Sequence, residues 1–201
     1  DITAFYHGLQ MQLPVYLNAA MDMEQKKHPG QEIQPAGIFY YRMKDPIVEK
    51  EKNEALLEEK LLKELKLDGL VNADEAVIQH LERGLTGNSS LIPVGKNKDG
   101  SLNRYSRVLA PDDFRTLLAY TKKKERELKE RILSGETRAW PYELGTETGC
   151  DYCAYRDICG FDDRLEGCEY QHMDKLDRDE AVERMRQNGK EQQGDERKMD
   201  Q

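Results

Sequence analysis

Apolar residues recur at helical spacing in four stretches, which predicts helices over residues 3–23, 49–67, about 76–83 and 111–134. Pro14 lies inside the first stretch, where it removes a backbone donor and crowds the carbonyl four residues earlier. We therefore expect a kink, or a late helix start near residue 10. Asn72 or Asp74 can cap the third helix. In the fourth helix, the residues expected to face inward are Phe114, Leu117, Leu118, Leu128 and Ile132.

Two further segments carry the signals of strands. Residues 37–44 are dense in aromatic and β-branched side chains, and this predicted strand stops at Asp45-Pro46. Residues 89–94 and 102–107 flank the dipeptide Asp99-Gly100, a strong turn signal, so we expect a β-hairpin there. The polar stretch 25–34 predicts a loop, and the charged residues 172–201 predict a disordered tail or a lone frayed helix. The pattern as a whole indicates an α/β fold that is mostly helical with a few strands.

The composition limits the classes of protein that fit. Hydrophobic residues make up 37% of the 201 residues and charged residues 35%, so part of the chain is expected to stay out of the core. The net charge of −8 argues against a nucleic-acid binder driven by overall charge, although a local basic groove is compatible with it. No apolar run is long enough to span a bilayer and no signal segment opens the chain, so we expect no membrane partner and a cytoplasmic location.

Three cysteines stand within ten residues, at Cys150, Cys153 and Cys159. Cys-x2-Cys puts two sulfurs on one tight turn, and the third follows about one and a half helical turns later, so all three can face one centre. Thiolates at this spacing suit zinc or an iron–sulfur cluster, and both metals need a fourth ligand to close the site. That ligand is either Cys168 or a residue outside the chain. The alternatives to a metal or cluster site are three unrelated buried cysteines or a disulfide framework.

Two other sets of residues are candidate functional groups. Gln12 and Tyr16 lie one helical turn apart on one face, where a packing tyrosine beside a solvated glutamine is the usual case. The hairpin tip and its flank carry basic residues that could contact phosphates, although a lysine-rich tip is more often merely soluble: Lys96, Lys98, Arg104 and Arg107. No phosphate-binding loop of the Gly-x4-Gly-Lys-Ser/Thr type is present, so ATP is not bound here by that route.

Several of these pieces, taken in order, resemble one known family. They are the segment Gly8 to Leu17, the strand 37–41 followed by Lys44-Asp45-Pro46, the hairpin with Ile92-Pro93, and the terminal Cys-x2-Cys-x5-Cys. Together they are similar to the C-terminal nuclease domain of the AddB proteins of bacterial AddAB helicase–nucleases, over residues 1–171. The resemblance implies a RecB-type PD-(D/E)xK nuclease fold, with residues 172–201 as an appended tail.

The resemblance also implies roles for particular residues. Cys150, Cys153 and Cys159 match the three C-terminal ligands of the family's [4Fe–4S] cluster, whose fourth cysteine comes from far upstream. Gln12 and Tyr16 match the Gln-x3-Tyr motif, in which the glutamine helps orient the attacking water or the catalytic lysine and the tyrosine supports the site or the nucleic-acid backbone. The implied activity is Mg²⁺-dependent cleavage of DNA during double-strand break repair, together with an AddA-like, ATP-driven partner subunit.

The chain departs from the family pattern at its catalytic metal site. The strands that carry the Asp and the Asp/Glu-x-Lys pair would lie before Asp1, so we expect an N-terminally truncated fragment that is inactive by itself. The Glu-x-Lys sequences present are expected to be surface charge pairs, at residues 24–26, 58–60, 64–66 and 127–129. Two alternatives stay open: a Cas4-like iron–sulfur nuclease, and a non-enzymatic binding module stapled by zinc through all four cysteines.

Overall fold

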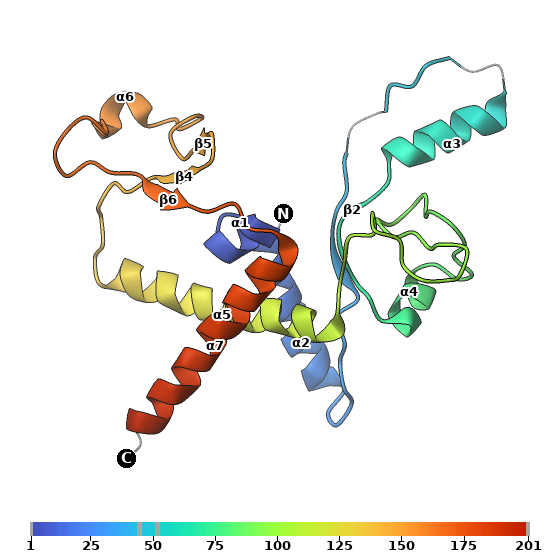
Figure 1. Cartoon of the computed structure of the whole chain (residues 1–201), viewed down its shortest axis with the longest axis horizontal. Coiled ribbons are helices and arrows are strands. Elements are labelled where there is room, and N and C mark those ends of the chain that lie inside the picture. The colour runs from blue at the N-terminus through green and yellow to red at the C-terminus, as the bar shows by residue number, and fades with distance from the viewer. Residues whose placement is uncertain (1, 44–45, 51–52, 200–201) are drawn as a thin grey trace. The chain divides into compact units, whose positions relative to one another are not determined.

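The computed structural model describes residues 2–43, 46–50 and 53–199, and it divides the chain into two compact units (Figure 1). One unit combines Asp1–Met11 with Ala119–Gln201, and the other is Gln12–Leu118. This division follows compactness, and it does not coincide with the predicted family boundary at residue 171. The predicted α/β class is confirmed, with helices predominating and one small sheet in each unit.

The predicted first helix is two helices, α1 (Ile2–His7) and α2 (Gln12–Lys27). Gly8 ends α1 with φ +81°, a left-handed conformation that disfavours any residue with a Cβ. Pro14 then lies in the first turn of α2, where a missing backbone N–H costs no helical hydrogen bond. The expectation of a late helix start near residue 10 is thus confirmed. The predicted loop begins later than residue 25, because α2 continues to Lys27.

A three-stranded sheet organises the Gln12–Leu118 unit. β1 (Gly37–Tyr40) pairs antiparallel with β2 (Asp68–Asn72), and β2 pairs parallel with β3 (Val108–Leu109). The predicted strand over 37–44 is therefore shorter, and its last residue and Asp45 lie outside the described residues. Helix α3 (Glu54–Glu64) starts where the Asn53 side chain accepts a hydrogen bond from the Ala55 backbone. It buries none of its side chains fully.

The core of this unit gathers around β2 and α4 (Glu75–Leu81). Asp74 caps α4 through the Ala76 backbone N–H, as one of the two predicted caps would. Asn72 is fully buried, donates to the Pro35 carbonyl and accepts from the Asp74 backbone, so it ties the entry of β1 to the start of α4. The buried residues of the core are Val71, Ile78, Leu85, Ile92 and Val94.

The predicted hairpin over residues 89–107 is wrong, although its turn is right. The turn closes through Gly100 N–H to the Asn97 carbonyl, and an isolated bridge joins Lys96 with Leu102 across it. Neither flank is a strand, and the other isolated bridge, Asn88 with Gly95, lies wholly before the turn. Residues 92–95 are all buried in succession. No strand is assigned to this buried run, so the segment is a packed loop.

The other unit combines α1 with the C-terminal half of α5 (Pro111–Leu133) and the elements that follow. The second sheet has the order β5-β4-β6, from β4 (Tyr142–Leu144), β5 (Glu147–Thr148) and β6 (Gln171–Met173). Near the C-terminus of α5, Leu128 is 38% and Ile132 74% exposed, so the prediction that both face inward is wrong. Phe114, Leu117 and Leu118, near its start, are buried as predicted.

The predicted disordered or frayed tail is corrected by the structure. Residues 171–173 form β6, and α7 (Arg178–Met199) contacts α1. The Thr3 hydroxyl donates to the Leu176 carbonyl at 2.8 Å, and a ring nitrogen of His7 lies 2.9 Å from the Asp174 carbonyl. A short apolar stripe supplies the burial that the composition hid: Leu176, Ala181, Val182 and Met185. These four residues are too few to raise the average hydrophobicity of the segment, but they bury the start of α7.

Within the part of the chain that the structure describes, no helix combines the length and the apolar character needed to cross a membrane.

Replacing Met185 with alanine tests the docking of α7. The side chain is 1% exposed, so Met185→Ala should lower the free energy of unfolding by about 2–4 kcal/mol through lost burial and a residual cavity. Urea unfolding followed by circular dichroism measures it. Gln187→Ala, on the exposed side of the same helix, is the control and should change little. Equal stability of the two variants would contradict a docked α7.

Candidate functional site

The cysteine segment follows the β4–β5 hairpin and is held by a local network of hydrogen bonds. The Asp151 carboxylate accepts from the backbone N–H and the hydroxyl of Thr148, both at 2.8 Å. The same Thr148 hydroxyl oxygen accepts from the Cys150 backbone N–H at 3.2 Å. These bonds lower the pKa of Asp151, because they favour its ionised form. The turn that carries the first two cysteines is therefore shaped by its own side chains.

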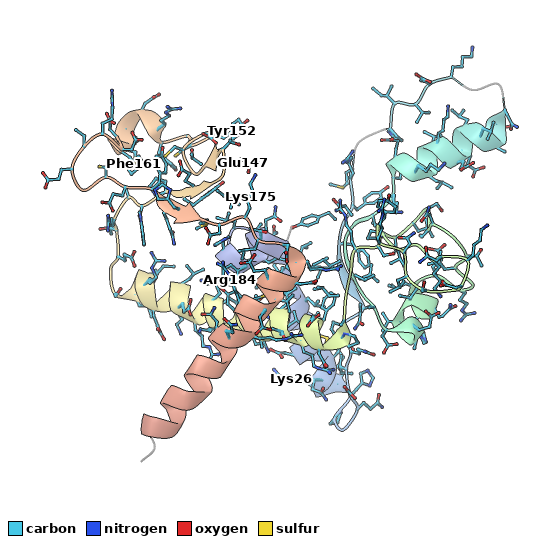
Figure 2. The ribbon with its side chains drawn as sticks, in the orientation of Figure 1. Lys26, Glu147, Tyr152, Phe161, Lys175 and Arg184 are labelled. Carbon is cyan, nitrogen blue, oxygen red and sulfur yellow. The ribbon has the colours of Figure 1, made fainter. Side chains whose placement is uncertain are left out.

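Cys150, Cys153 and Cys159 all line one pocket of about 360 Å³. Cys159 ends the short helix α6 (Arg156–Cys159), whose amides bond back to the Tyr155 carbonyl. All four cysteines carry free thiols. Cys168 does not line this pocket. Figure 2 labels Tyr152, fully exposed on this loop, and Phe161 just beyond the third cysteine.

Charged and aromatic side chains complete the pocket around the thiols. Arg164 donates to Asp162 at 2.6 Å, and this bond lowers the pKa of Asp162 to about 2. Phe161 packs edge-on against Tyr170 with ring centroids 5.0 Å apart. A hydrogen bond with Cys150 raises the pKa of the Tyr170 hydroxyl, so the aromatic pair also contacts the first cysteine.

The thiols suit a metal centre by their chemistry but do not form a closed one. Three sulfurs on one pocket match the donor type that zinc and iron–sulfur clusters use. However, among the described residues, no group of three or more His, Cys, Asp or Glu side chains has the arrangement of a ready-made metal site. The donor type therefore suits such a centre, but the described residues do not by themselves present one.

Gln12 and Tyr16 lie together at the start of α2. The Gln12 amide donates to the Tyr16 hydroxyl at 3.1 Å, and both side chains are exposed, Tyr16 by 59%. The expectation that Tyr16 is a packing tyrosine is therefore wrong. A buried tyrosine would be explained by packing alone, whereas this pair presents an amide and a hydroxyl to its surroundings.

The basic residues of the 96–107 loop have different neighbours. Lys96 is only 10% exposed and pairs with Glu75 at 2.6 Å, so its ammonium group is already held by a carboxylate. Lys98 is exposed near the turn. The Arg104 guanidinium lies over the Tyr105 ring, 4.7 Å from its centroid. Arg107 pairs with Asp68.

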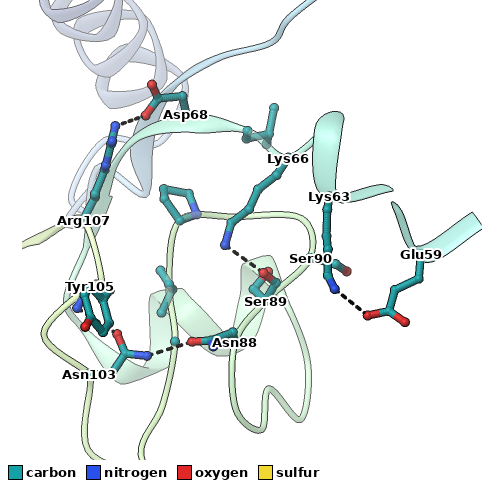
Figure 3. A pocket seen from close by; sticks show the side chains of 14 residues that line it. Glu59, Lys63, Lys66, Asp68, Asn88, Ser89, Ser90, Asn103, Tyr105 and Arg107 are labelled. Carbon is teal, nitrogen blue, oxygen red and sulfur yellow. Dashed lines mark hydrogen bonds and ion pairs between the residues drawn. The ribbon is translucent and has the colours of Figure 1, made fainter. Parts of the chain in front are cut away.

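Sequence reasoning missed a second pocket, of about 580 Å³, which we call the 59–107 pocket (Figure 3). Its cations come from α3 and its C-terminal end and from the residue before β3, and its amides come from two loops. The charged residues around it are Glu59, Lys63, Lys66, Asp68 and Arg107, and the uncharged polar and aromatic ones are Asn88, Ser89, Ser90, Asn103 and Tyr105. Only Arg107 had a sequence signal as a possible phosphate contact.

Comparison with known families shows the superfamily to which the chain belongs. Residues 2–160 match the sequence pattern of the PD-(D/E)XK nuclease superfamily. The chain belongs to this superfamily. The match covers the Gln12–Tyr16 pair, the 59–107 pocket and the three clustered cysteines.

Curated relatives of this PD-(D/E)XK protein are named as the B component of an ATP-dependent helicase/deoxyribonuclease. One from Lachnoclostridium phytofermentans is 36% identical over 190 residues, which cover 90% of this chain and 16% of the relative. One from Alkaliphilus metalliredigens is 36% identical over 187 residues, covering 92% and 16%, and one from Clostridioides difficile is 35% identical over 192 residues, with the same coverage. The resemblance inferred from the motifs is confirmed. The chain spans 16% of the length of these relatives.

The Glu-x-Lys sequences do not supply the catalytic motif that names the PD-(D/E)XK superfamily. Residues 24–26 lie in α2, 58–60 in α3, 64–66 at the end of α3 and 127–129 in α5, and not on strands. Several of their charges form local pairs, such as Glu24 with Lys27 and Glu59 with Lys63. Most of these charged side chains are exposed, as predicted, but Lys66 donates to the Ser89 carbonyl and lines the 59–107 pocket.

The titration of Asp162 tests the wall of the cysteine pocket. Its pKa of about 2 lies below the usual 3.8 chiefly because Arg164 bonds to the ionised carboxylate, so Arg164→Gln should raise that pKa. Because the folded-state pKa is lowered, the contribution of this contact is present at neutral pH and is lost as the pH falls toward 2. Carboxyl carbon NMR measures both states. Asp151, whose pKa is lowered by Thr148, is the internal control, and an unchanged Asp162 would contradict the contact.

Proposed function

We propose that the chain is part of a Mg²⁺-dependent deoxyribonuclease subunit in an ATP-driven helicase–nuclease that processes double-strand breaks. The observation that carries the proposal is the shared pocket of Cys150, Cys153 and Cys159 at the end of the region that matches the PD-(D/E)XK pattern. The names of the relatives supply the helicase and deoxyribonuclease context. An AddA-like subunit and DNA are the partners that this context implies.

Cys150, Cys153 and Cys159 would hold a [4Fe–4S] cluster together with a fourth cysteine from upstream sequence. Such a cluster supplies a structural staple, because it joins chain segments that are distant in sequence. The chain's own residues shape the turn through Asp151 and Thr148 and keep an aromatic contact at Cys150 through Tyr170. Cys168, which lies outside the pocket lining, is not assigned as a ligand.

Gln12 and Tyr16 are the residues proposed to serve the nuclease chemistry. Gln12 would orient the attacking water or the catalytic lysine, and the hydroxyl of Tyr16, which accepts from the Gln12 amide, would hold that amide in place. The acidic ligands of Mg²⁺ and the lysine are proposed to lie outside this chain. The chain by itself is therefore expected to be inactive.

Metal analysis of the longer subunit tests the cluster. Anaerobically purified protein that includes the upstream sequence should be brown and contain four irons and four sulfides per chain, as one [4Fe–4S] cluster requires. Serine at Cys150, Cys153 or Cys159 should remove the colour and the iron, because each substitution deletes one thiolate. Visible absorbance and iron and sulfide assays measure this.

Cys168→Ser is the matched control and should keep the cluster. Loss of the iron in that variant would make Cys168 a ligand. One zinc per chain in residues 1–201 alone, lost on Cys168→Ser, would instead favour the zinc-stapled binding module and would contradict the proposed cluster.

Cleavage by the same longer subunit tests Gln12. Gln12→Ala should lower the rate of Mg²⁺-dependent DNA cleavage by roughly 10²-fold, since a misplaced reacting group costs about that much. DNA binding should be unchanged, because the role is positioning at the reacting centre. Gln31→Ala, in the exposed loop after α2, is the control. A Gln12→Ala enzyme with full cleavage activity would overturn the assignment.

A further inference from the structure

One wall of the 59–107 pocket is a fixed pair of amides. Asn103 Nδ2 donates to Asn88 Oδ1 at 2.8 Å, and Asn103 Oδ1 accepts from the Tyr105 backbone N–H at 3.0 Å. Gly95 makes the pair possible, because a Cβ there would lie 2.3 Å from both Asn103 Nδ2 and Asn88 Oδ1. The amides are thus held in place before any ligand arrives. Asparagine amides carry donors and acceptors that match the edges of nucleobases.

Tyr105 stands beside this wall with its ring 74% exposed. Its backbone is anchored to Asn103, and its ring is steadied by the Arg104 guanidinium, which lies 4.7 Å from the ring centroid and also bonds to the hydroxyl. An exposed tyrosine of fixed orientation next to paired amides is not explained by core packing. Aromatic rings in such positions accept flat, unsaturated rings by stacking.

Lys63 and Lys66 lie across the pocket from Tyr105, whereas Arg107 lies on the same side as Tyr105 (Figure 3). The Lys66 ammonium donates one hydrogen bond, to the Ser89 carbonyl at 2.8 Å, and an ammonium group has three donors. Lys63 pairs with Glu59 at 2.7 Å, and both side chains are more than half exposed. Arg107 and Asp68 are similarly exposed. Exposed pairs of this kind contribute little, so a phosphate can share or replace the carboxylate partner.

We propose that the 59–107 pocket binds one nucleotide of a single DNA strand, with the base on Tyr105, its edge at Asn88 and Asn103, and the flanking phosphates at Lys66 and Arg107. The volume of about 580 Å³ falls in the range of small-molecule sites. The inference rests on the proposed nuclease function, which supplies the DNA. It deepens that function, because it adds a strand-holding subsite distinct from Gln12 and Tyr16.

The arrangement selects a single strand over a duplex. In a duplex the base faces are stacked and the Watson–Crick edges are paired, so neither can meet Tyr105 and the amides. An unstacked base offers its face and its edge at once, while its phosphates reach the cations. The subsite therefore serves to hold an unwound strand, and its cations alone cannot distinguish the two forms of DNA.

Binding of a fluorescein-labelled single-stranded oligodeoxynucleotide to the 201-residue chain tests the proposal. By fluorescence anisotropy, Tyr105→Ala should weaken binding about tenfold, in line with the loss of one stacked base. Tyr105→Phe should bind as the unaltered chain does, because it keeps the ring. Tyr41 is another exposed tyrosine and lies outside the pocket, so Tyr41→Ala should also leave binding unchanged. Equal binding by the unaltered chain and Tyr105→Ala would overturn the proposal.

Photochemical cross-linking locates the base. An oligonucleotide that carries 5-iododeoxyuridine should cross-link to Tyr105 on irradiation, and an unlabelled single strand should compete whereas a blunt duplex of the same sequence should not. A cross-link only outside residues 59–107, or equal competition by the duplex, would contradict base insertion. Failure here, with Mg²⁺-dependent cleavage by the longer subunit intact, rejects the pocket alone. Absence of that cleavage, with the cross-link at Tyr105 present, rejects the nuclease proposal but keeps a strand-binding site.

Discussion

The Gln12–Leu118 unit depends on side-chain hydrogen bonds that hold a loop without a regular ladder. The Ser89 hydroxyl oxygen accepts from the backbone N–H groups of Leu91 and Ile92, both at 2.9 Å. The same hydroxyl donates a hydrogen bond to the Glu82 carboxylate. The Ser106 hydroxyl accepts from the Gly95 backbone, also at 2.9 Å. These bonds satisfy the buried backbone that strand pairing would otherwise have satisfied. Asn88 and Asn103 come face to face on either side of Gly95, which bridges to Asn88 and accepts from the Asn103 backbone N–H at 2.8 Å.

The sequence predicts those features of this fold that are decided within a few residues. Pro14 predicts the helix break, Asp74 caps α4, and the Asp99-Gly100 turn forms where its dipeptide stands. Each of these is a local preference of the backbone. The predictions of a hairpin and of a disordered tail are wrong because burial against distant segments decides both structures. For α7, that distant segment is α1. A pattern read over one segment carries no information on what that segment packs against.

The same distinction separates the two candidate sites. The cysteines can be found from the sequence, because three thiols lie within ten residues and a short turn suffices to bring them to one pocket. The 59–107 pocket gathers ordinary side chains from residues 44 positions apart along the chain, such as Lys63 and Arg107. Taken alone, each of these two side chains is explained as a solvated surface charge. Only their meeting on one cavity, next to an oriented tyrosine, suggests a ligand, and that meeting is a property of the tertiary fold.

Different interactions stabilise the two sites. The cysteine loop rests on exposed hydrogen bonds, such as Asp151 with Thr148 and Asp162 with Arg164. Exposed bonds of this kind stabilise little, so metal binding would provide most of the order of this loop. The 59–107 pocket stands instead on buried Val71, Ile78 and Val94, which pack without any metal. Loss of a cluster would therefore loosen the cysteine loop while the amide and tyrosine wall of the other unit stays formed.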